Sequence, residues 1–322
     1  MIKNYLKRFK EDDFTIKIYD KFDENNWKLF LFCYKNIFRE IEKKIFEWLF
    51  LKKNIFGILT NIENDYIGIY GLLKINLNFS GKHINSYLCH NVGVSEKYSG
   101  KGLFQYLGDK SLSSQLHTNN LVLGFPNKAS KKGHLRLGWK SIAEVYFSKF
   151  ESTKKDLLLD KKFEFKSIDK FETINFNENE FSLNVSKDKD YLNWRISKPN
   201  ENYIKYIIVK NNIIQGYVIY KIYQNNKSKK LHLVDFNFLN IDVLNEIIKF
   251  SILKFKDSDC QILNTWIVED TIFENKFNEY GFNKDIEMQS FPVILFQKEE
   301  KFDFSKIDKE RIFFTLFDND VF

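Results

Sequence analysis

The chain has 322 residues, of which 43% are hydrophobic and 17% aromatic, with only 13 glycines and 3 prolines. This composition excludes a disordered or fibrous protein, and the length suits two domains that each bury a core of their own. The formal net charge of +7 would favour anionic partners, but 43 acidic residues are interleaved with the basic ones. We therefore expect no nucleic-acid partner.

The cysteines and the apolar runs indicate the compartment. Cys33, Cys89 and Cys260 are widely spaced and odd in number, which predicts free thiols in a reducing compartment and neither a disulfide framework nor a metal site. Residues 1–10 lack the apolar core of a signal peptide, and the densest apolar run, 29–34, is too short to cross a bilayer. We expect a soluble, cytoplasmic protein without membrane insertion.

The first half of the chain predicts strands and helices in an α/β order. Strands are predicted at 14–19, 55–61, 66–78, 84–94 and 120–125. Apolar residues at helical spacing predict helices within 27–51 and 102–116. A further short helix is predicted to begin at Pro126 and to end near Gly138. A strand within 139–150 is expected to close this half.

The second half repeats this order. A hairpin is expected at 203–209 and 213–223, a strand at 231–238, a helix at 242–255 and a closing strand at 291–296. Residues 280–282 precede that closing strand as residues 137–139 precede the earlier one, which indicates an internal duplication. We predict an N-terminal domain over 1–150, a charged linker over 151–190 and a C-terminal domain over 191–322.

The most informative segment is Val94–Phe104, which places Gly100 and Gly102 between a strand and an amphipathic helix. Glycine accepts positive φ and lets the backbone approach a ligand, while the first turn of a helix offers unpaired N–H groups and a positive dipole end. The segment therefore predicts an anion site. The alternative is an ordinary tight turn from strand to helix.

Two motifs in this half resemble the GNAT superfamily of acyl-CoA-dependent N-acetyltransferases. The family pattern Val-x-Pro-x-Tyr-Arg-Gly-Lys-Gly-(Ile/Leu) is matched by Val94, Tyr98, Gly100, Lys101, Gly102 and Leu103. The later pattern Asn-x-x-(Ala/Ser)-x-x-x-Tyr-x-x-Leu-Gly-Phe is matched by Asn127, Ser130, His134, Leu137, Gly138 and Trp139, with His134 and Trp139 as substitutions. Ser99 replaces the family's Arg or Gln, and Phe104 replaces a small residue. The match covers about residues 50–150, and the second half resembles tandem members by element order only.

The resemblance implies two tandem GNAT-like domains, each a twisted mixed, mostly antiparallel sheet flanked by helices. It implies acetyl-CoA or another acyl-CoA as co-substrate, no metal, and a gap for the pantetheine arm between strands 84–94 and 120–125. The pyrophosphate would rest on the backbone amides of residues 100–104. The implied cofactor-binding residues are Val92, Val94, Tyr98, Ser99, Gly100, Lys101, Gly102, Leu103, Phe104, Asn127 and Ser130. The second half has no glycine in the corresponding loop, between Phe238 and Leu244, and we expect it to bind no CoA.

Acyl transfer to an amine needs a base, a donor N–H for the thioester carbonyl and an acid for the leaving thiolate. His134 stands where the family places its acidic tyrosine, and an imidazolium there would protonate the thiolate; the alternative is an exposed helix histidine. His90 is the candidate base, with a hydrogen-bonded core histidine as the alternative. A backbone N–H near Val92 would polarise the carbonyl. Trp194, Arg195 and Asp235 are candidate acceptor contacts, with interface packing and a satisfied buried carboxylate as alternatives.

The resemblance implies an N-acyltransferase that moves an acyl group, expected to be acetyl as in members of this family, from acyl-CoA to a primary amine by direct attack in a ternary complex. Residues 124–127 and 193–195 resemble members from surface-polysaccharide gene sets, which implies an amino sugar, in nucleotide-linked form, as acceptor. A tandem aminoglycoside or protein-lysine acetyltransferase is the first alternative. Peptidoglycan aminoacyl transferases, which use charged tRNA, need no pyrophosphate loop, so the glycines argue against them. A catalytically silent GNAT-like binding module is the alternative of another class.

Overall fold

The computed structural model describes residues 7–21, 23–37, 42–52, 54–116, 120–174, 180–226 and 228–319. The chain divides into two compact units. Unit 1 takes its residues from Met1–Leu77, Ile84–Ile142 and Phe291–Phe304, and unit 2 from Asn78–His83, Ala143–Ser290 and Ser305–Phe322.

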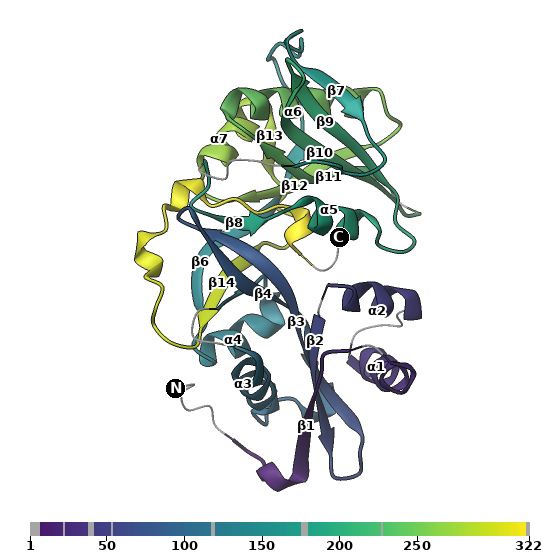
Figure 1. Ribbon diagram of the computed structural model, residues 1–322, viewed down its shortest axis with the longest axis vertical. Helices are drawn as coiled ribbons and strands as arrows, with labels where there is room; N and C mark the ends of the chain where they lie inside the picture. Colours follow the sequence, from purple (N-terminus) through teal and green to yellow (C-terminus); the bar gives the residue numbers. More distant parts are fainter. Residues whose placement is uncertain are drawn as a thin grey trace. The chain divides into compact units, whose positions relative to one another are not determined.

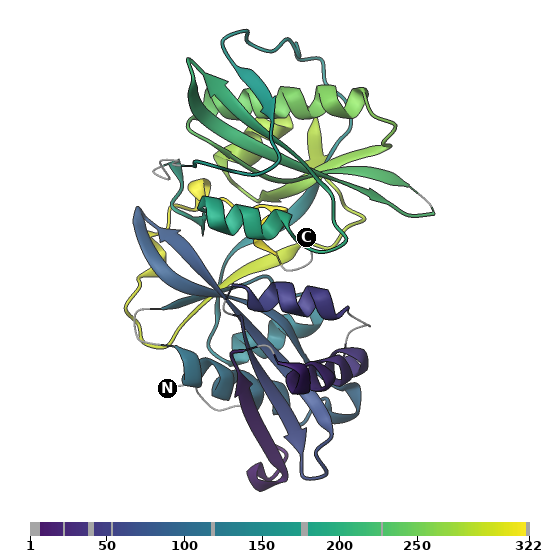
Figure 2. The same ribbon diagram turned by 45° about the vertical axis from the view of Figure 1, so that its right-hand side comes forward.

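Unit 1 contains a mixed sheet covered by helices on both faces. Its strands follow one another in the order β1 (Phe14–Tyr19), β2 (Asn54–Asn61), β3 (Tyr66–Phe79), β4 (Lys82–Val94), β5 (Leu121–Gly124) and β14 (Phe291–Gln297). The helices are α1 (Glu24–Ile37), α2 (Lys43–Phe50), α3 (Leu103–Gln115) and α4 (Lys128–Arg136). Helices α3 and α4 lie on one face of the strands, and α1 and α2 lie on the other (Figure 1, Figure 2). The pairs β1–β2, β2–β3 and β5–β14 are antiparallel, whereas β4–β5 is parallel.

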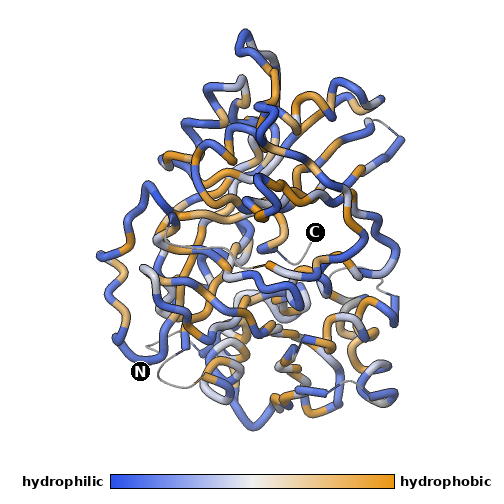
Figure 3. Tube along the Cα trace, turned by 45° about the horizontal axis from the view of Figure 1, so that its top comes forward, coloured by the Kyte–Doolittle hydropathy of each residue, from blue (hydrophilic) through white to orange (hydrophobic). Residues whose placement is uncertain are grey.

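The alternation of side chains along β2 explains why both faces need helices. Ile55 and Leu59 belong to the core beneath α3. Phe56 points the other way, and its ring centroid lies 5.0 Å from that of Phe30 in α1 and 5.8 Å from that of Phe46 in α2. A strand buried on both faces reads as a continuous apolar run. Hydrophobic residues accordingly gather in the strands and helices, and the connecting loops are mostly hydrophilic (Figure 3).

Unit 2 repeats this architecture. Its strands follow the order β6 (Lys140–Phe150), β12 (Ile262–Val268), β11 (Lys229–Phe238), β10 (Ile213–Gln224), β9 (Tyr203–Lys210) and β7 (Glu164–Ser167). The strands β8 (Leu183–Ser186) and β13 (Phe282–Lys284) and the helices α5 (Lys189–Ile196), α6 (Ile241–Lys256) and α7 (Ile272–Glu279) complete it. Asn211 and Asn212 both have positive φ and form the tight hairpin turn expected between β9 and β10.

The two closing strands differ from the prediction. Strand β6, expected to close the first half, pairs antiparallel with β12 and β13 in unit 2. Strand β14, expected to close the second half, pairs with β5 in unit 1, where Ile294 lies opposite Gly124. The expectation that each half closes its own sheet is therefore wrong, because an apolar run predicts a buried strand without specifying its partner. The division at residues 150 and 190 stays a prediction.

Candidate functional site

The predicted anion loop has an unusual backbone. After β4 the chain passes through the short 3₁₀ turn Glu96–Tyr98 and enters α3 at Leu103. Gly100 has φ 75° and Gly102, the N-cap of α3, has φ 90°. A Cβ on Gly100 would meet no atom within 4 Å. The glycine there is required by the left-handed backbone and not by lack of space.

The first turn of α3 is open to a ligand. Gly102 has no side chain to cap the helix, and the helical bonding begins with the Tyr106 N–H, which donates to the Gly102 carbonyl at 3.1 Å. Within the part of the chain that the structure describes, the backbone N–H groups of residues 100–105 have no hydrogen-bond acceptor. Ser99, Gly100 and Lys101 are exposed. Unpaired amides at the positive end of a helix are the usual receptor for phosphate.

Two of the predicted binding residues hold this loop in place through their side chains. The Tyr98 hydroxyl accepts a hydrogen bond from Asn61 Nδ2 at 3.1 Å, and its ring meets that of Phe14 edge-on. Leu103 is 1% exposed in the core beneath α3. These side chains fix the backbone, so contacts to a ligand fall to the amides and to exposed Ser99 and Lys101.

The strands on either side of the predicted gap pair over only part of the length of β4. The parallel pairing of β4 with β5 runs from Ser86 to Cys89, which lies opposite Gly124, the last residue of β5. Strand β4 continues to Val94 without β5 beside it. Asn91 has φ 47°. At this point the alternation shifts by one residue, since Tyr87 and Cys89 and then Val92 and Val94 pack on the same core.

The second motif positions α4. The Asn127 side chain caps the helix by accepting from the Ser130 N–H at 3.0 Å and the Ser130 hydroxyl at 3.1 Å. Gly138, with φ 93°, ends the helix: its N–H donates to the Leu135 carbonyl at 3.1 Å, and the N–H of Trp139 donates to the His134 carbonyl at 3.3 Å. Asn127 and Ser130 thus set where His134 lies.

His134 is 3% exposed and is held in one tautomer. Its Nδ1–H donates to the Ser130 carbonyl at 3.0 Å, so Nε2 carries the lone pair of the neutral ring. The ring packs edge-on against Phe104 and Trp139, each at 5.1 Å between centroids. Burial lowers the pKa of His134 to about 4. A ring with this pKa is neutral at neutral pH, and the role of His134 as the acid stays a prediction.

Phe104 lies against α4. Its ring contacts His134, and a Cβ on Gly133 would come within 2.6 Å of Phe104 Cε1. Gly133 therefore lets the Phe104 ring lie close to the α4 backbone. The large residue in place of the family's small one fills the space between α3 and α4.

Sequence reasoning missed the group that faces His134. Cys89 Sγ lies 3.6 Å from His134 Nε2, and Cys89 is half-buried. Tyr70, on the neighbouring strand β3, is close by: burial and then the Cys89 thiol raise the pKa of its hydroxyl well above the usual value, while the Trp139 indole acts in the opposite direction. The signal available in the sequence was the alternation of β4, which places Cys89 on the face of α3 and α4.

His90 lies on the opposite face of β4 and is 4% exposed. Its Nε2–H donates to Asn54 Oδ1 at 2.7 Å, and its Nδ1 accepts from Asn91 Nδ2 at 2.7 Å. Both ring nitrogens are thus engaged, as in the hydrogen-bonded core histidine that was the alternative. The role of base stays a prediction, and it would require the bond from Asn91 to open.

Comparisons with known proteins identify the fold of the chain. No protein-family model and no curated protein matches the sequence. Among solved structures, a GCN5-related N-acetyltransferase (GNAT) from Anabaena variabilis matches with a TM-score of 0.65 and 11% identity, over 87% of this chain and 72% of that one. A probable N-acyltransferase of unknown function from Enterococcus faecalis matches at 0.62 and 14%, over 88% and 73%. Saccharomyces cerevisiae N-myristoyltransferase with bound myristoyl-CoA matches at 0.60 and 11%, over 97% and 92%.

The chain has the GNAT fold. The predicted fold class, mixed α/β with mostly antiparallel strands and flanking helices, is confirmed. Within the described residues no helix is long and apolar enough to cross a membrane, and no three or more His, Cys, Asp or Glu side chains gather as a metal site would require.

The GNAT-like second unit uses its polar residues internally. Asp235 is fully buried, with Oδ1 2.6 Å from Lys187 Nζ and Oδ2 accepting from the Tyr217 hydroxyl at 2.9 Å. Asp318 Oδ1 is 2.9 Å from the same Nζ. Burial alone would lower the pKa of Lys187, but the two carboxylates outweigh it and raise the pKa above its usual value. Asp235 is thus a satisfied buried carboxylate, the alternative to an acceptor contact.

Trp194 and Arg195, the other candidate acceptor contacts, are 6% and 1% exposed. An Arg195 Nη2–H donates to the Asn319 carbonyl at 2.8 Å, and the guanidinium lies 5.0 Å from the centroid of the Phe317 ring. These contacts tie α5 to the end of the described chain within unit 2. They favour a structural role for both side chains.

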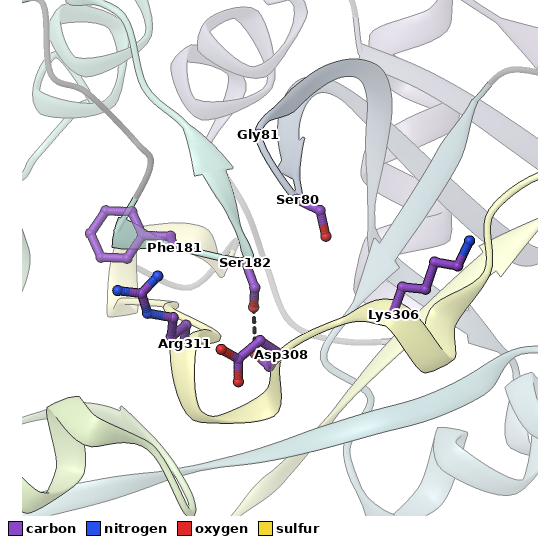
Figure 4. Close-up of a pocket in the computed structure, with 7 residues that line it drawn as sticks. All are labelled: Ser80, Gly81, Phe181, Ser182, Lys306, Asp308 and Arg311. Carbon is purple, nitrogen blue, oxygen red and sulfur yellow. Dashed lines mark hydrogen bonds between the residues drawn. The ribbon is translucent and has the colours of Figure 1, made fainter.

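A hollow of about 340 Å³ lies elsewhere in unit 2. Its lining is Ser80, Gly81, Phe181, Ser182, Lys306, Asp308 and Arg311 (Figure 4). The Ser182 hydroxyl donates to the backbone carbonyl of Asp308 at its rim. None of the residues predicted for the active site of the GNAT fold lines it.

Proposed function

We propose that this chain is an acyl-CoA-dependent N-acyltransferase that transfers an acyl group to a primary amine. The observation that carries the proposal is the open first turn of α3, in which Gly100 and Gly102 leave the amides of residues 100–105 without an acceptor among the described residues. The diphosphate of CoA would bind these amides. The pantetheine arm would extend along Val92 and Val94, where β5 no longer pairs with β4. Yeast N-myristoyltransferase, of similar fold, was solved with myristoyl-CoA bound.

The acceptor that we propose is an amino sugar in nucleotide-linked form. Support comes from the segments at 124–127 and 193–195, which resemble transferases of surface-glycan synthesis. In the structure these residues cap α4 and pack α5, so they would act by shaping the fold and not by touching the sugar. A peptide or lysine amine is the competing acceptor. An amine panel decides between them.

Direct attack in a ternary complex requires a base and an acid. Both ring nitrogens of His90 are engaged, and burial lowers the pKa of His134 to about 4, which favours the uncharged ring at neutral pH. A direct route would therefore need His90 to open its bond to Asn91, or a water to remove the proton.

Two measurements on the full chain test the proposal. Isothermal titration with acetyl-CoA and longer acyl-CoAs is expected to show one site, weakened by inorganic pyrophosphate, which competes for the α3 amides. Free thiol release is then followed with a panel of nucleotide-linked amino sugars, free amino sugars, aminoglycosides and lysine peptides. Absence of acyl-CoA binding at millimolar ligand would contradict the proposal and favour a silent binding module. Binding with turnover of peptides alone would overturn the amino-sugar acceptor.

A further inference from the structure

The neighbours of His134 are arranged as a nucleophile, a base and an orienting group. Its Nδ1–H is committed to the Ser130 carbonyl at 3.0 Å, because a carbonyl can only accept. Nε2 is left as the acceptor, and the thiol that faces it at 3.6 Å is Cys89. A thiol beside a base whose other nitrogen is fixed by a third group is the arrangement found in nucleophilic catalysis.

This pair lies where the proposed thioester would pass. Cys89 is the last residue of β4 that pairs with β5, so it stands at the inner end of the gap proposed for pantetheine. Phe104, in the first turn of α3, touches the His134 ring. The phosphate loop, the gap and the thiol therefore lie on the same face of β4, the face that α3 and α4 cover.

Two buried polar atoms beside the pair make no hydrogen bond of regular geometry among the described residues, although the Tyr70 hydroxyl lies near enough to the Cys89 thiol and the Trp139 indole for both to shift its pKa. They are Tyr70 Oη and Trp139 Nε1, in side chains that are 0% and 3% exposed. An unsatisfied buried polar group costs about 1–3 kcal/mol. A hydroxyl and an indole N–H are both hydrogen-bond donors, the type of group that stabilises a developing oxyanion.

We propose that Cys89 is an acyl-accepting nucleophile and that His134 is its base. The inference rests on the proposed N-acyltransferase function. Cys89 Sγ forms a bond to the thioester carbonyl carbon while its proton passes to His134 Nε2. The carbonyl carbon–sulfur bond of acyl-CoA breaks, and the proton passes from Nε2 to the CoA thiolate. The acceptor amine then attacks the acyl-Cys89 thioester, its proton passes through Nε2 to the departing Cys89 sulfur, and the amide and the free thiol remain.

The resting state is consistent with this order of events. Burial lowers the pKa of His134 to about 4, so the ring is neutral at physiological pH and its Nε2 lone pair is available to the Cys89 proton. The same burial makes the ring a weak base, so the proton moves to Nε2 as the Cys89 sulfur bonds to the carbonyl carbon and not before. Tyr70 Oη and Trp139 Nε1 would donate to the carbonyl oxygen as it becomes negative. Ser130 is a positioning residue, because its carbonyl fixes the tautomer.

The test is acyl labelling of the full chain by acetyl-, butyryl- and myristoyl-CoA with no amine present, followed by intact mass and peptide mapping. The expected result is one acyl group on Cys89, removable by hydroxylamine, and transferred to product when the amine is added. Cys89→Ala should abolish labelling and lower kcat on the order of 10²-fold or more. Cys89→Ser keeps the shape of the site if the alanine variant does not fold. Cys260→Ala is the matched control, which should label as the wild type does.

The outcomes separate the inference from the function on which it rests. If acyl-CoA binds and amine is acylated, but no acyl-Cys89 forms and Cys89→Ser keeps the wild-type kcat, the covalent route is overturned and the proposed function stands. If acyl-CoA does not bind at all, both the covalent route and the proposed N-acyltransferase function are overturned. Initial rates give a second readout: parallel double-reciprocal plots support the covalent route, and intersecting plots contradict it.

Discussion

The N-termini of α3 and α6 hold the same place in the element order of the two halves, but their backbone amides differ in availability. Gly102 begins α3 at φ 90° without a side-chain cap. Asn240 begins α6 at φ −158°, and its Oδ1 accepts from the N–H groups of Asp242 and Val243 at 3.1 and 3.2 Å. One helix end is left for a ligand, and the other is satisfied by its own chain. The proposed binding unit and the second unit therefore differ in the cap of this helix.

The strands before these helices show the same contrast. In β4, Cys89 is the last residue that packs on the helix-covered core before the alternation of side chains shifts. The corresponding residue of β11 is Leu233, and Phe236 is the next residue of β11 that packs on the core of unit 2. The Leu233 carbonyl accepts a hydrogen bond from the Thr265 hydroxyl of β12 at 2.9 Å. This hydrogen bond joins β11 to β12 at the position where β4 and β5 separate in unit 1. The aliphatic side chain of Leu233 lies where unit 1 has the thiol of Cys89. The two units share an order of strands and helices, and the candidate catalytic residues lie in unit 1 alone.

The largest expected effect concerns the buried charges of unit 2. Replacing Lys187 by Met leaves Asp235 and Asp318 buried without their cation, which should lower the free energy of unfolding by about 3–5 kcal/mol. Urea denaturation measures this. Lys189→Met, at an exposed position of the same segment, should change it by less than about 0.5 kcal/mol. Equal effects of the two substitutions would mean that the polar groups of unit 2 are not needed for its stability.

Acid should destabilise both units through a buried histidine in each. Burial lowers the pKa of His134 and of His232 from 6.5 to about 4. As the pH falls, these histidines bind protons near pH 6.5 in the unfolded chain but only near pH 4 in the folded chain. The free energy of unfolding therefore decreases as the pH drops through this window. The full loss is about 3 kcal/mol per histidine.

Urea denaturation at several pH values checks this prediction. His134→Gln and His232→Gln should each flatten the dependence between pH 6.5 and about 4, whereas His83→Gln, at an exposed position, should not. A flattening by only one of the two would show that one histidine is charged in the folded protein.

The contrast between the two helix ends is tested directly by ligand binding. Gly102→Val places a branched side chain at φ 90°, where L-residues are strained by about 1–2 kcal/mol. The loop should no longer adopt the backbone conformation that exposes its amides. The affinity for CoA, measured by titration calorimetry, should fall about tenfold or more. Asn240→Gly, which removes the cap of α6, should leave the affinity unchanged. A loss of affinity in Asn240→Gly would move the site to the second half.

The smallest effect concerns the cap of α6 itself. Asn240→Ala should reduce the free energy of unfolding by about 1 kcal/mol, because two amides lose their acceptor, and Asn240→Gly by only a few tenths. Chemical denaturation resolves the difference. Identical losses would indicate that the Asn240 side chain does not act as a cap.

The sequence predicted the parts of the site that depend on local backbone. Positive φ at Gly100 and Gly102, the helix that follows, and the capped α4 that ends at Gly138 were all expected from short-range rules. Asn127 shows where such reasoning stops. Its place in the motif was correct, but its side chain caps α4, and no local rule distinguishes that contact from one to a cofactor.

What escaped prediction depends on contacts between residues far apart in sequence. The burial that leaves His134 uncharged, and the approach of Cys89 to within 3.6 Å of its Nε2, arise where α4 packs on β4. Asp235 could not be assigned without knowing that Lys187 and Asp318 meet it inside unit 2. Burial and charge compensation depend on the tertiary structure. The periodicity of the sequence therefore reduces the number of candidate site residues but does not identify which of them are functional.

The placement of β14 beside β5 has a consequence for biosynthesis. Residues 291–297 belong to the sheet of unit 1, so a growing polypeptide cannot complete that sheet until these residues have been synthesised. Until then β5 offers an unpaired apolar edge, the kind of surface that chaperones shield. A nascent chain interrupted before residue 291 would lack the strand that covers it, and release of an unfinished product would invite aggregation.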